Sequence, residues 1–306
     1  MVIRTGMIGV SEGNGHPFSF SAIVNGYDDA RFAEAGWPVI LDYLRKQPAG
    51  RFGIGDARVT HAWTQDPAIT GRLCAACRIE TACADVSDML GAIDALIIAR
   101  DDWESHAKLA LPFLRSGIPV FIDKPLTLDS TELASFMPFL QGGLLMSCSG
   151  LRYAAELDPM RVPEPDTGPI RLISGTVLNG LDKYGIHLIE AVASLGNAYA
   201  RPIAITRLVA PHASYLLHFD SGVPFHLDCL GTVGKTFHLS VFGERSHRHF
   251  DLHDNFSAFR GTLEKFYTMV RTKVPAISPH ETAHVMRLLM AAGALSPGES
   301  TSLGSI

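Results

Sequence analysis

The segment "LALPFLRSGIPVFIDKPLTLD", residues 109–129, contains a complete helix–turn–strand unit. Its first half has the apolar spacing of a helix and ends at Gly117, a residue type that readily takes the left-handed conformation that closes helices. The run "IPVFID" (118–123) is short and almost continuously apolar, which predicts a strand buried on both faces. The polar pair Asp123 and Lys124 follows at once. The segment therefore predicts a parallel strand with polar groups at its carboxyl end.

Further strands and helices surround this unit on both sides. Four other apolar runs predict buried strands, at 2–10, 58–65, 94–100 and 144–150. Helical patterns lie between the runs, at 66–79, 103–117 and 129–140, the first of them behind Asp66 as its N-cap. Strands that alternate with helices in this way predict an α/β fold, a doubly wound parallel sheet whose ligands bind at the carboxyl ends of the strands.

A Gly-rich stretch, "GVSEGNGHP" (9–17), follows the first apolar run. The dinucleotide-binding turn G-x-G-x-x-G starts correctly at Gly9, but its second and third glycine positions hold Ser11 and Asn14. The other glycines lie in a lengthened loop before the helix. We expect this loop to present N–H groups to a pyrophosphate at the helix N-terminus; an ordinary Gly-rich connection is the alternative. The candidate residues are Gly9, Ser11, Gly13, Asn14, Gly15 and His16.

An insertion at about 28–57 separates this helix from the next strand and carries a helical pattern at 38–46. It is interpreted either as packing on the domain or as a flap over a ligand.

Composition excludes several classes of function. The chain has 306 residues, of which 47% are hydrophobic, and its net charge is −5 with scattered basic residues, so neither nucleic acid nor a membrane is expected as a partner. The sequence shows no leader or spanning segment, and its five cysteines are odd in number, so we expect a cytoplasmic protein. Cys74 and Cys77 are interpreted as small buried side chains. No metal site is expected, either there or at the histidines of 244–254.

Residues 109–129 closely resemble the Gfo/Idh/MocA family of oxidoreductases, which is named after glucose–fructose oxidoreductase and inositol dehydrogenase. Asp123-Lys124-Pro125 stands where that family has Glu-Lys-Pro, and "HAKLALPFL", with His106, "SGLRY" (149–153) and the helical patterns of 254–299 agree in order. The resemblance implies a Rossmann domain over 1–149 and a second α/β domain over 150–306 for substrate binding and oligomerisation. Its large, mainly antiparallel open sheet would join a homodimer or homotetramer.

The sequence beyond residue 150 supports this second sheet independently. Alternating runs at 169–179, 202–210, 213–231 and 235–244 are separated by turn formers, as in antiparallel hairpins.

The family's catalytic Asp-x-x-x-His motif matches "NGLDKYGIHLIEAV" (179–192) with one change. His187 falls on the family histidine, but Lys183 replaces the aspartate, and Asp182 comes one place too early. The resemblance implies that Lys124 and His187 are catalytic, with Lys183 beside them. The substrate contacts that it implies are Lys124, Arg152, Tyr153, Lys183, Tyr184 and His187.

The resemblance also implies a nicotinamide cofactor, NAD or NADP. Thr64 and Gln65 stand where the family carries an acid for the ribose hydroxyls, so the sequence does not choose between the two. Arg100, Asp101, Asp123 and Lys124 complete the expected cofactor site beside the Gly-rich loop.

The function expected from these observations is an NAD(P)-dependent oxidoreductase that interconverts a secondary alcohol and a ketone. Its substrate would be a polyhydroxylated small molecule: a sugar, a cyclitol or a sugar-derived acid. Two alternatives remain open. One is a cofactor-binding sensor or partner protein that has lost the activity, and the other is a redox-neutral lyase or hydrolase with tightly held NAD.

Overall fold

A computed structural model describes residues 2–304, which pack as two units. Of the described residues, the first unit contains 2–127, 134–147 and 262–277, and the second contains 128–133, 148–261 and 278–304. The sequence predicts a single domain boundary, after residue 149. The main difference is in residues 262–277, which pack with the first unit although the prediction places them in the second domain.

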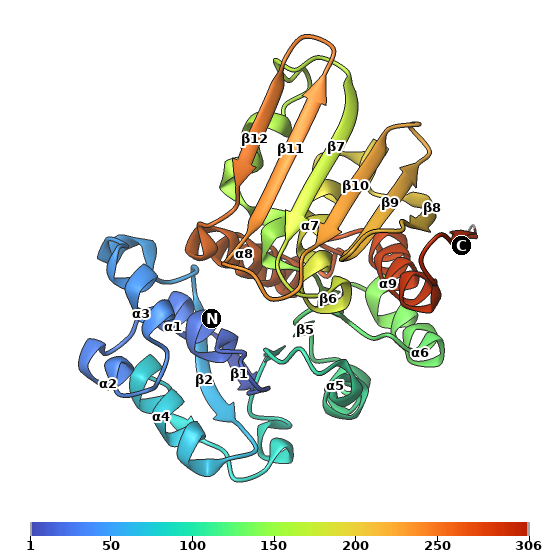
Figure 1. The fold of residues 1–306 in the computed structure, drawn as a ribbon. Helices are drawn as coiled ribbons and strands as arrows, with labels where there is room; N and C mark the ends of the chain where they lie inside the picture. Colours follow the sequence, from blue (N-terminus) through green and yellow to red (C-terminus); the bar gives the residue numbers. More distant parts are fainter. Residues whose placement is uncertain (1, 305–306) are drawn as a thin grey trace. The chain divides into compact units, whose positions relative to one another are not determined.

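The first unit is built on a six-stranded parallel sheet in the order β3-β2-β1-β4-β5-β6 (Figure 1). Its strands are β1 (Ile3–Ile8), β2 (Ala57–Trp63), β3 (Thr81–Ala82), β4 (Ala95–Ile98), β5 (Val120–Ile122) and β6 (Leu145–Ser147). The five predicted strands and the doubly wound fold are confirmed. The edge strand β3 was not predicted, because two exposed residues make no apolar run.

The helices of this half of the chain agree with the predicted patterns. They are α1 (His16–Asn25), α4 (Pro67–Cys77), α5 (His106–Arg115) and α6 (Ser130–Gln141). Asp66 caps α4 as predicted, since its carboxylate accepts a 2.8 Å hydrogen bond from the N–H of Ala68. The pattern at 103–117 begins with a 3₁₀ turn, η3 (Trp103–Ser105), and Gly117 follows the helix with φ +78°.

The insertion forms α2 (Asp29–Ala33), α3 (Pro38–Arg45) and the turn η1 (Ala49–Arg51), which pack onto α1. Phe18 of α1 lies 5.9 Å from Phe32 and 6.0 Å from Trp37, measured between ring centroids. Leu41 and Leu44 of α3 are buried. The insertion is therefore part of the core of the first unit.

The second unit contains a seven-stranded sheet in the order β12-β11-β7-β10-β9-β8-β13 (Figure 1). Its strands are β7 (Ile170–Val177), β8 (Pro202–Arg207), β9 (Ala213–Phe219), β10 (Pro224–Cys229), β11 (Phe237–Gly243), β12 (His247–Asp251) and β13 (Ser300–Ser302). Neighbouring strands are antiparallel except β7 and β10. The predicted mainly antiparallel sheet is confirmed, whereas the short strand β13 was not predicted.

One face of this sheet is covered by α7 (Ile186–Ala193). Gly175 of β7 permits this close approach, because a Cβ there would lie 3.0 Å from the side chain of Leu188. Phe225 and Leu227 of β10 are buried on the same side, while the alternating His226 and Asp228 are only partly covered. The remaining elements are the turns η2 (Val86–Met89), η4 (Gly150–Tyr153), η5 (Ala155–Met160), η6 (Leu181–Gly185) and η7 (Asn197–Tyr199), and the helices α8 (Asn255–Thr272) and α9 (Pro279–Ala294).

The five cysteines are all free thiols. Burial raises the pKa of Cys74 to about 11, so it is a poor nucleophile at neutral pH. None of the helices in residues 2–304 is long and apolar enough to cross a membrane.

Gly9 allows the turn after β1 to pack on the first turn of α1. A Cβ at Gly9 would lie 2.2 Å from Cγ of Pro17, whereas a Cβ at Gly71 of α4 would meet nothing within 4 Å. We predict that Gly9→Ala lowers the free energy of unfolding by about 2 kcal/mol, because the ring must move. Gly71→Ala, the matched control, should raise it by about 0.5 kcal/mol through helix propensity. Urea unfolding measures both, and equal effects would contradict the packing argument.

Candidate functional site

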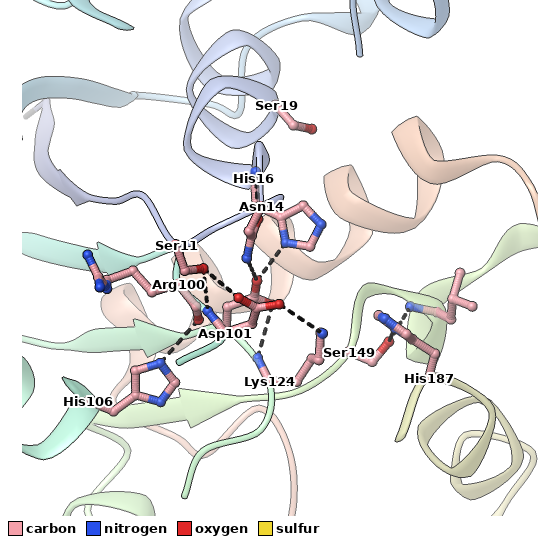
Figure 2. A network of polar contacts seen from close by, with 12 residues as sticks. Ser11, Asn14, His16, Ser19, Arg100, Asp101, His106, Lys124, Ser149 and His187 are labelled. Atoms are coloured by element: carbon pink, nitrogen blue, oxygen red, sulfur yellow. Dashed lines mark hydrogen bonds and ion pairs between the residues drawn. The ribbon is translucent and has the colours of Figure 1, made fainter. Parts of the chain in front are cut away.

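Polar side chains gather at the carboxyl ends of β1, β4 and β5, where the strand order reverses. The loop after β1 supplies three of these residues, the loop after β4 supplies one, and the end of β5 supplies two. Figure 2 shows the cluster, which consists of Ser11, Asn14, His16, Asp101, Asp123 and Lys124. The structure thus brings together six of the residues that the sequence assigns to the cofactor site.

Asp123 is the most connected member of this cluster and is 2% exposed. Its Oδ2 atom lies 2.6 Å from Nδ1 of His16 and accepts a 3.2 Å hydrogen bond from the amide of Asn14. Its Oδ1 atom accepts a 3.0 Å hydrogen bond from the N–H of Lys124. Burial alone would raise the pKa of Asp123, but the charges and hydrogen bonds of His16 and Lys124 outweigh burial and lower it to about 2. The carboxylate is therefore ionised throughout the neutral range.

Lys124 occupies the carboxyl end of β5 with its side chain 5% exposed. Its Nζ atom lies 3.9 Å from Oδ2 of Asp101, and its peptide bond to Pro125 is cis. The other oxygen of Asp101 accepts a 2.5 Å hydrogen bond from the hydroxyl of Ser11. A buried ammonium beside an oriented carboxylate keeps a cation at the end of the strand.

The Gly-rich loop is closed by its own side chains. Asn14 donates its N–H to the carbonyl of Ser11 (3.1 Å) and accepts the N–H of His16 on its Oδ1 atom (2.9 Å), which begins α1. A Cβ at Gly15 would lie 2.5 Å from the ring of Trp37, so that glycine is required by the insertion. Gly13 differs, since its φ is +73° and its Cβ position is open.

This loop fits an anionic group at Gly13. No hydrogen bond from the N–H of Glu12, Gly13 or Gly15 reaches an acceptor within residues 2–304. Backbone N–H groups around an open glycine, next to a helix N-terminus, suit a phosphate oxygen.

The residues predicted at the end of β2 have structural partners. The hydroxyl of Thr64, in a residue 2% exposed, lies 2.9 Å from that of Thr70, so Thr64 belongs to the interior. Gln65 exchanges hydrogen bonds with the backbone of Val10, at 3.1 and 2.7 Å. Arg100 forms a bidentate pair with Asp102, at 2.8 and 2.6 Å.

Gln65 and Arg100 also line a cavity of about 460 Å³ within the first unit. Its other walls are mostly apolar and come from β2, the 85–90 segment and α5: Trp63, Val86, Leu90, Leu109, Pro112 and Phe113. An apolar cavity of this volume beside the end of β2 suits the flat adenine ring of a dinucleotide.

His106 holds two of these loops together. It is fully buried, and its ring nitrogens lie 3.0 Å from the carbonyl oxygen of Leu126 and 3.1 Å from that of Arg100. Burial lowers the pKa of His106. The neutral ring has a single N–H, so it donates to one of the two carbonyls while its other nitrogen packs against the second.

The second unit supplies a separate polar group, His187, at the start of α7. Its Nδ1 atom lies 2.6 Å from Oγ of Ser149, a fully buried residue whose Oγ also accepts the N–H of Leu151 at 3.1 Å (Figure 2). The rings of Tyr184 and Phe237 pack beside the imidazole, with centroids 6.0 and 5.4 Å away. Ser149 was missed by the sequence reasoning, although a polar residue directly after a buried strand was a usable signal.

The segment before His187 departs from the expected α-helix. Residues Leu181–Gly185 form a π-helical turn, in which the N–H of Gly185 bonds the carbonyl of Gly180 at 3.0 Å. Lys183 lies on this turn and is exposed, as is Asp182. The α-helical i,i+4 alignment of the family motif therefore does not describe Lys183 and His187 here.

Arg152, a predicted substrate contact, is held in buried ion pairs within the second unit. Its Nε atom lies 2.5 Å from Oε2 of Glu190 and its Nη1 atom lies 2.6 Å from Oε1 of Glu281. Burial raises the pKa of Glu190 against the opposing effect of Arg152. Burial also raises the pKa of the neighbouring Tyr153. The two ion pairs with Glu190 and Glu281 balance the positive charge of Arg152 inside the second unit.

We predict that Asp123→Asn destabilises the protein by about 2 kcal/mol at pH 7, since the folded pKa lies about two units below the unfolded one. A depressed carboxyl pKa stabilises the fold above pH 3.8 and loses this effect as pH falls towards 2. The difference from the wild type should therefore shrink between pH 4 and about 2. Urea unfolding across this range is the measurement, and a pH-independent difference would contradict the ion-pair account.

Comparisons with known proteins agree with this geometry. Residues 3–138 match the Gfo/Idh/MocA model, an oxidoreductase family with an NAD-binding Rossmann fold. A putative UDP-kanosamine synthase oxidoreductase subunit of Amycolatopsis mediterranei (strain S699) is 29% identical over 120 residues, which are 39% of this chain. The match spans 33% of that curated relative.

Solved structures match over nearly the whole chain and show the fold. Myo-inositol 2-dehydrogenase from Lactobacillus plantarum is 16% identical with a TM-score of 0.74, covering 96% of each chain. Myo-inositol dehydrogenase from Lactobacillus casei, in complex with NAD(H) and myo-inositol, is 14% identical with a TM-score of 0.73, covering 100% of this chain and 98% of that one. The N-terminal residues 3–138 therefore match the Gfo/Idh/MocA family of oxidoreductases, and the chain as a whole has the fold of these dehydrogenase structures.

Proposed function

We propose that the protein is an NAD(P)-dependent oxidoreductase that interconverts a secondary alcohol and a ketone on a cyclitol, a sugar or a sugar-derived acid. The observation that carries this proposal is Lys124, a buried cation 3.9 Å from Asp101 at the carboxyl end of β5. The likeness to structures of inositol dehydrogenases supports a polyhydroxylated substrate.

The residues that would hold the cofactor come from the first unit. The loop N–H groups around Gly13 would bind the pyrophosphate, and the 460 Å³ cavity lined by Gln65 and Arg100 would take the adenosine part. The bound nicotinamide would accept or deliver the hydride of the reacting carbon. Because the lining of this cavity includes the carboxylate of Asp85 as well as the cations of Arg100 and Lys108, NAD and NADP both remain candidates.

His187 would exchange the proton of the substrate hydroxyl through Nε2. Nε2 can accept this proton only when the neutral ring carries its hydrogen on Nδ1, so Nδ1–H donates to Oγ of Ser149 in both the neutral and the protonated state of the ring. In the oxidative direction the carbon loses a hydride and the oxygen loses a proton to His187. The reverse direction returns both.

Lys124 would stabilise negative charge on the reacting oxygen. A compact ammonium provides this charge at a fixed place, with a carboxylate oxygen of Asp101 3.9 Å from its Nζ atom. Lys183 and Tyr184, on the π-helical turn before His187, are the proposed contacts to substrate hydroxyl or carboxylate groups.

A cofactor-binding sensor is the second candidate, and the observation that favours it is Lys183 in place of the family aspartate. This exchange leaves the family motif without its carboxylate, one of the two side chains that the motif combines. Cofactor binding without turnover of any polyol would select the sensor.

The open face of the second sheet supports a homo-oligomer. Phe242 of β11 is 36% exposed, and Leu172 of β7 is partly exposed on the same face. We propose that this face joins a homodimer or homotetramer.

The Ser149–His187 pair predicts a specific loss of turnover. Ser149→Ala should lower kcat by about tenfold, and His187→Gln by about a hundredfold, with little change in NADH affinity. Ser147→Ala is the matched control: the Ser147 hydroxyl is buried without a hydrogen-bond partner among the described residues, so its removal should leave kcat unchanged. NAD(P)H absorbance with myo-inositol, scyllo-inositol and sugar substrates measures the rates, and a fall in NADH affinity that matches the loss of turnover would contradict the assignment.

Lys124 gives the sharper test of the proposed function. Lys124→Ala should lower kcat by at least about a thousandfold because the charge that stabilises the reacting oxygen is lost. Lys124→Arg should restore little, since a planar guanidinium does not replace a compact ammonium in a buried place. A Lys124→Ala protein that folds, binds NADH and keeps most of its turnover would overturn the mechanism.

A further inference from the structure

The second unit contains a cavity that the proposed reaction does not use. Its volume is about 270 Å³, and it lies between the 197–201 segment and the first turns of α9. Its polar lining consists of Asn197, Arg201, Ser278, His280, Glu281 and His284.

His284 is the unusual member of this lining. The residue is 5% exposed, and its ring makes no hydrogen bond or ion pair to any acceptor or donor within residues 2–304. The ring nitrogens are not fully enclosed by the described chain, and His284 is one of the residues that line the cavity. A buried polar ring that faces a cavity without a partner indicates a missing ligand.

The charges around His284 are mainly positive. Burial, and then Arg201, Arg287 and His280, lower the pKa of His284, while Asp220 opposes them. The opposing carboxylate is loosely held, because Asp220 lies 4.0 Å from Arg201 and both are half-exposed. The cavity therefore disfavours an added proton on His284 unless an anion enters.

The sequence of this helix suggests a different ligand at first sight. "HETAH" (280–284) is H-E-x-x-H, a motif that holds zinc on a helix with its glutamate as general base. Here Oε1 of Glu281 forms an ion pair with the buried Arg152, 2.6 Å from its Nη1 atom, although this oxygen makes no hydrogen bond among the described residues. No group of three metal-binding side chains occurs in the described part of the chain, and a guanidinium lines the cavity. These facts disfavour a cation.

The backbone adds to the attraction for an anion. α9 has 16 residues, and its N-cap, Ser278, makes no side-chain cap hydrogen bond. Pro279 at the start of this helix has no N–H, whereas the N–H groups of His280 and Glu281, two residues that line the cavity, reach no acceptor within residues 2–304.

We propose that this cavity binds a small oxyanion, either inorganic phosphate or the phosphate group of a small metabolite. Arg201 pairs with the anion, His280 and His284 donate ring N–H groups to it, and the first turn of α9 faces it. Because His280 and His284 are four residues apart on one helix, both rings reach the same ligand. The site is independent of the proposed dehydrogenase residues.

Proton uptake should accompany binding. The anion offsets the charges of Arg201, Arg287 and His280 that keep His284 neutral, while Asp220 and Glu281 are the carboxylates on this side.

Isothermal titration calorimetry on the full chain tests the proposal with inorganic phosphate and with glycerol 3-phosphate, which distinguish the free ion from a phosphate ester. Arg201→Gln and His284→Gln should each weaken binding by about tenfold or more. His218→Gln changes an exposed histidine of β9 outside the cavity and should leave the affinity unchanged. If His284→Gln fails to fold, Arg201→Gln and His280→Gln test the proposal instead, because both of these residues are exposed.

Binding of either probe that is lost in the cavity variants supports the site. No binding of either probe at millimolar concentration would overturn it, and so would binding that the cavity variants leave intact. Stoichiometric binding of Zn²⁺ that depends on His280 and His284, without phosphate binding, would show that the motif holds a cation and would also overturn the proposal.

Discussion

The buried carboxylate of Asp123 is the interaction on which the candidate site in the first unit depends. It accepts hydrogen bonds from two different segments, the loop after β1 and its own strand end, and so fixes Asn14 and His16 relative to Lys124. A buried carboxylate is costly unless it is paired, and here the paired donors more than repay its desolvation, as the pKa of about 2 shows. The same contacts that keep Asp123 charged therefore place the cation at the end of β5.

In the second unit the hydrogen-bond partner of His187 is the hydroxyl of Ser149, where a charged pair would have a carboxylate. Ser149 is fully buried and orients His187 without adding charge, while the family aspartate position carries Lys183 on a π-helical turn. An imidazole next to a carboxylate is biased towards its charged form, whereas one next to a hydroxyl keeps its neutral form available. For the proposed proton transfer, Ser149 therefore orients the ring of His187 without adding a charge beside it.

The sequence predicted those helices and strands whose burial produces a recognisable pattern of apolar residues. The strands around Ile97 and Phe121 are continuously apolar because helices cover both faces, and Asp66 precedes a helix as an N-cap. It missed β3 and β13, because both strands are too short and too exposed to bury apolar side chains. It also missed the π-helical turn before His187, because the spacing of hydrophobic residues does not reveal a single residue added to a helical turn. The partner Ser149 and the cavity at His284 were missed because they depend on residues far apart in the chain meeting in three dimensions.

The irregular spacing of the Gly-rich loop has a physical cause in the insertion that follows it. Trp37 and Ile40 of the insertion pack against Gly15, where a side chain would collide with them, so one glycine is used for helix packing. Gly9 is used in the same way against Pro17, which leaves Gly13 as the glycine with open space and a positive φ. Asn14 closes the loop by capping α1 through its side chain. The three tasks of a dinucleotide turn, namely the tight turn, the open approach and the close helix packing, are thus present but assigned to shifted positions, which is why a fixed sequence pattern does not recognise them.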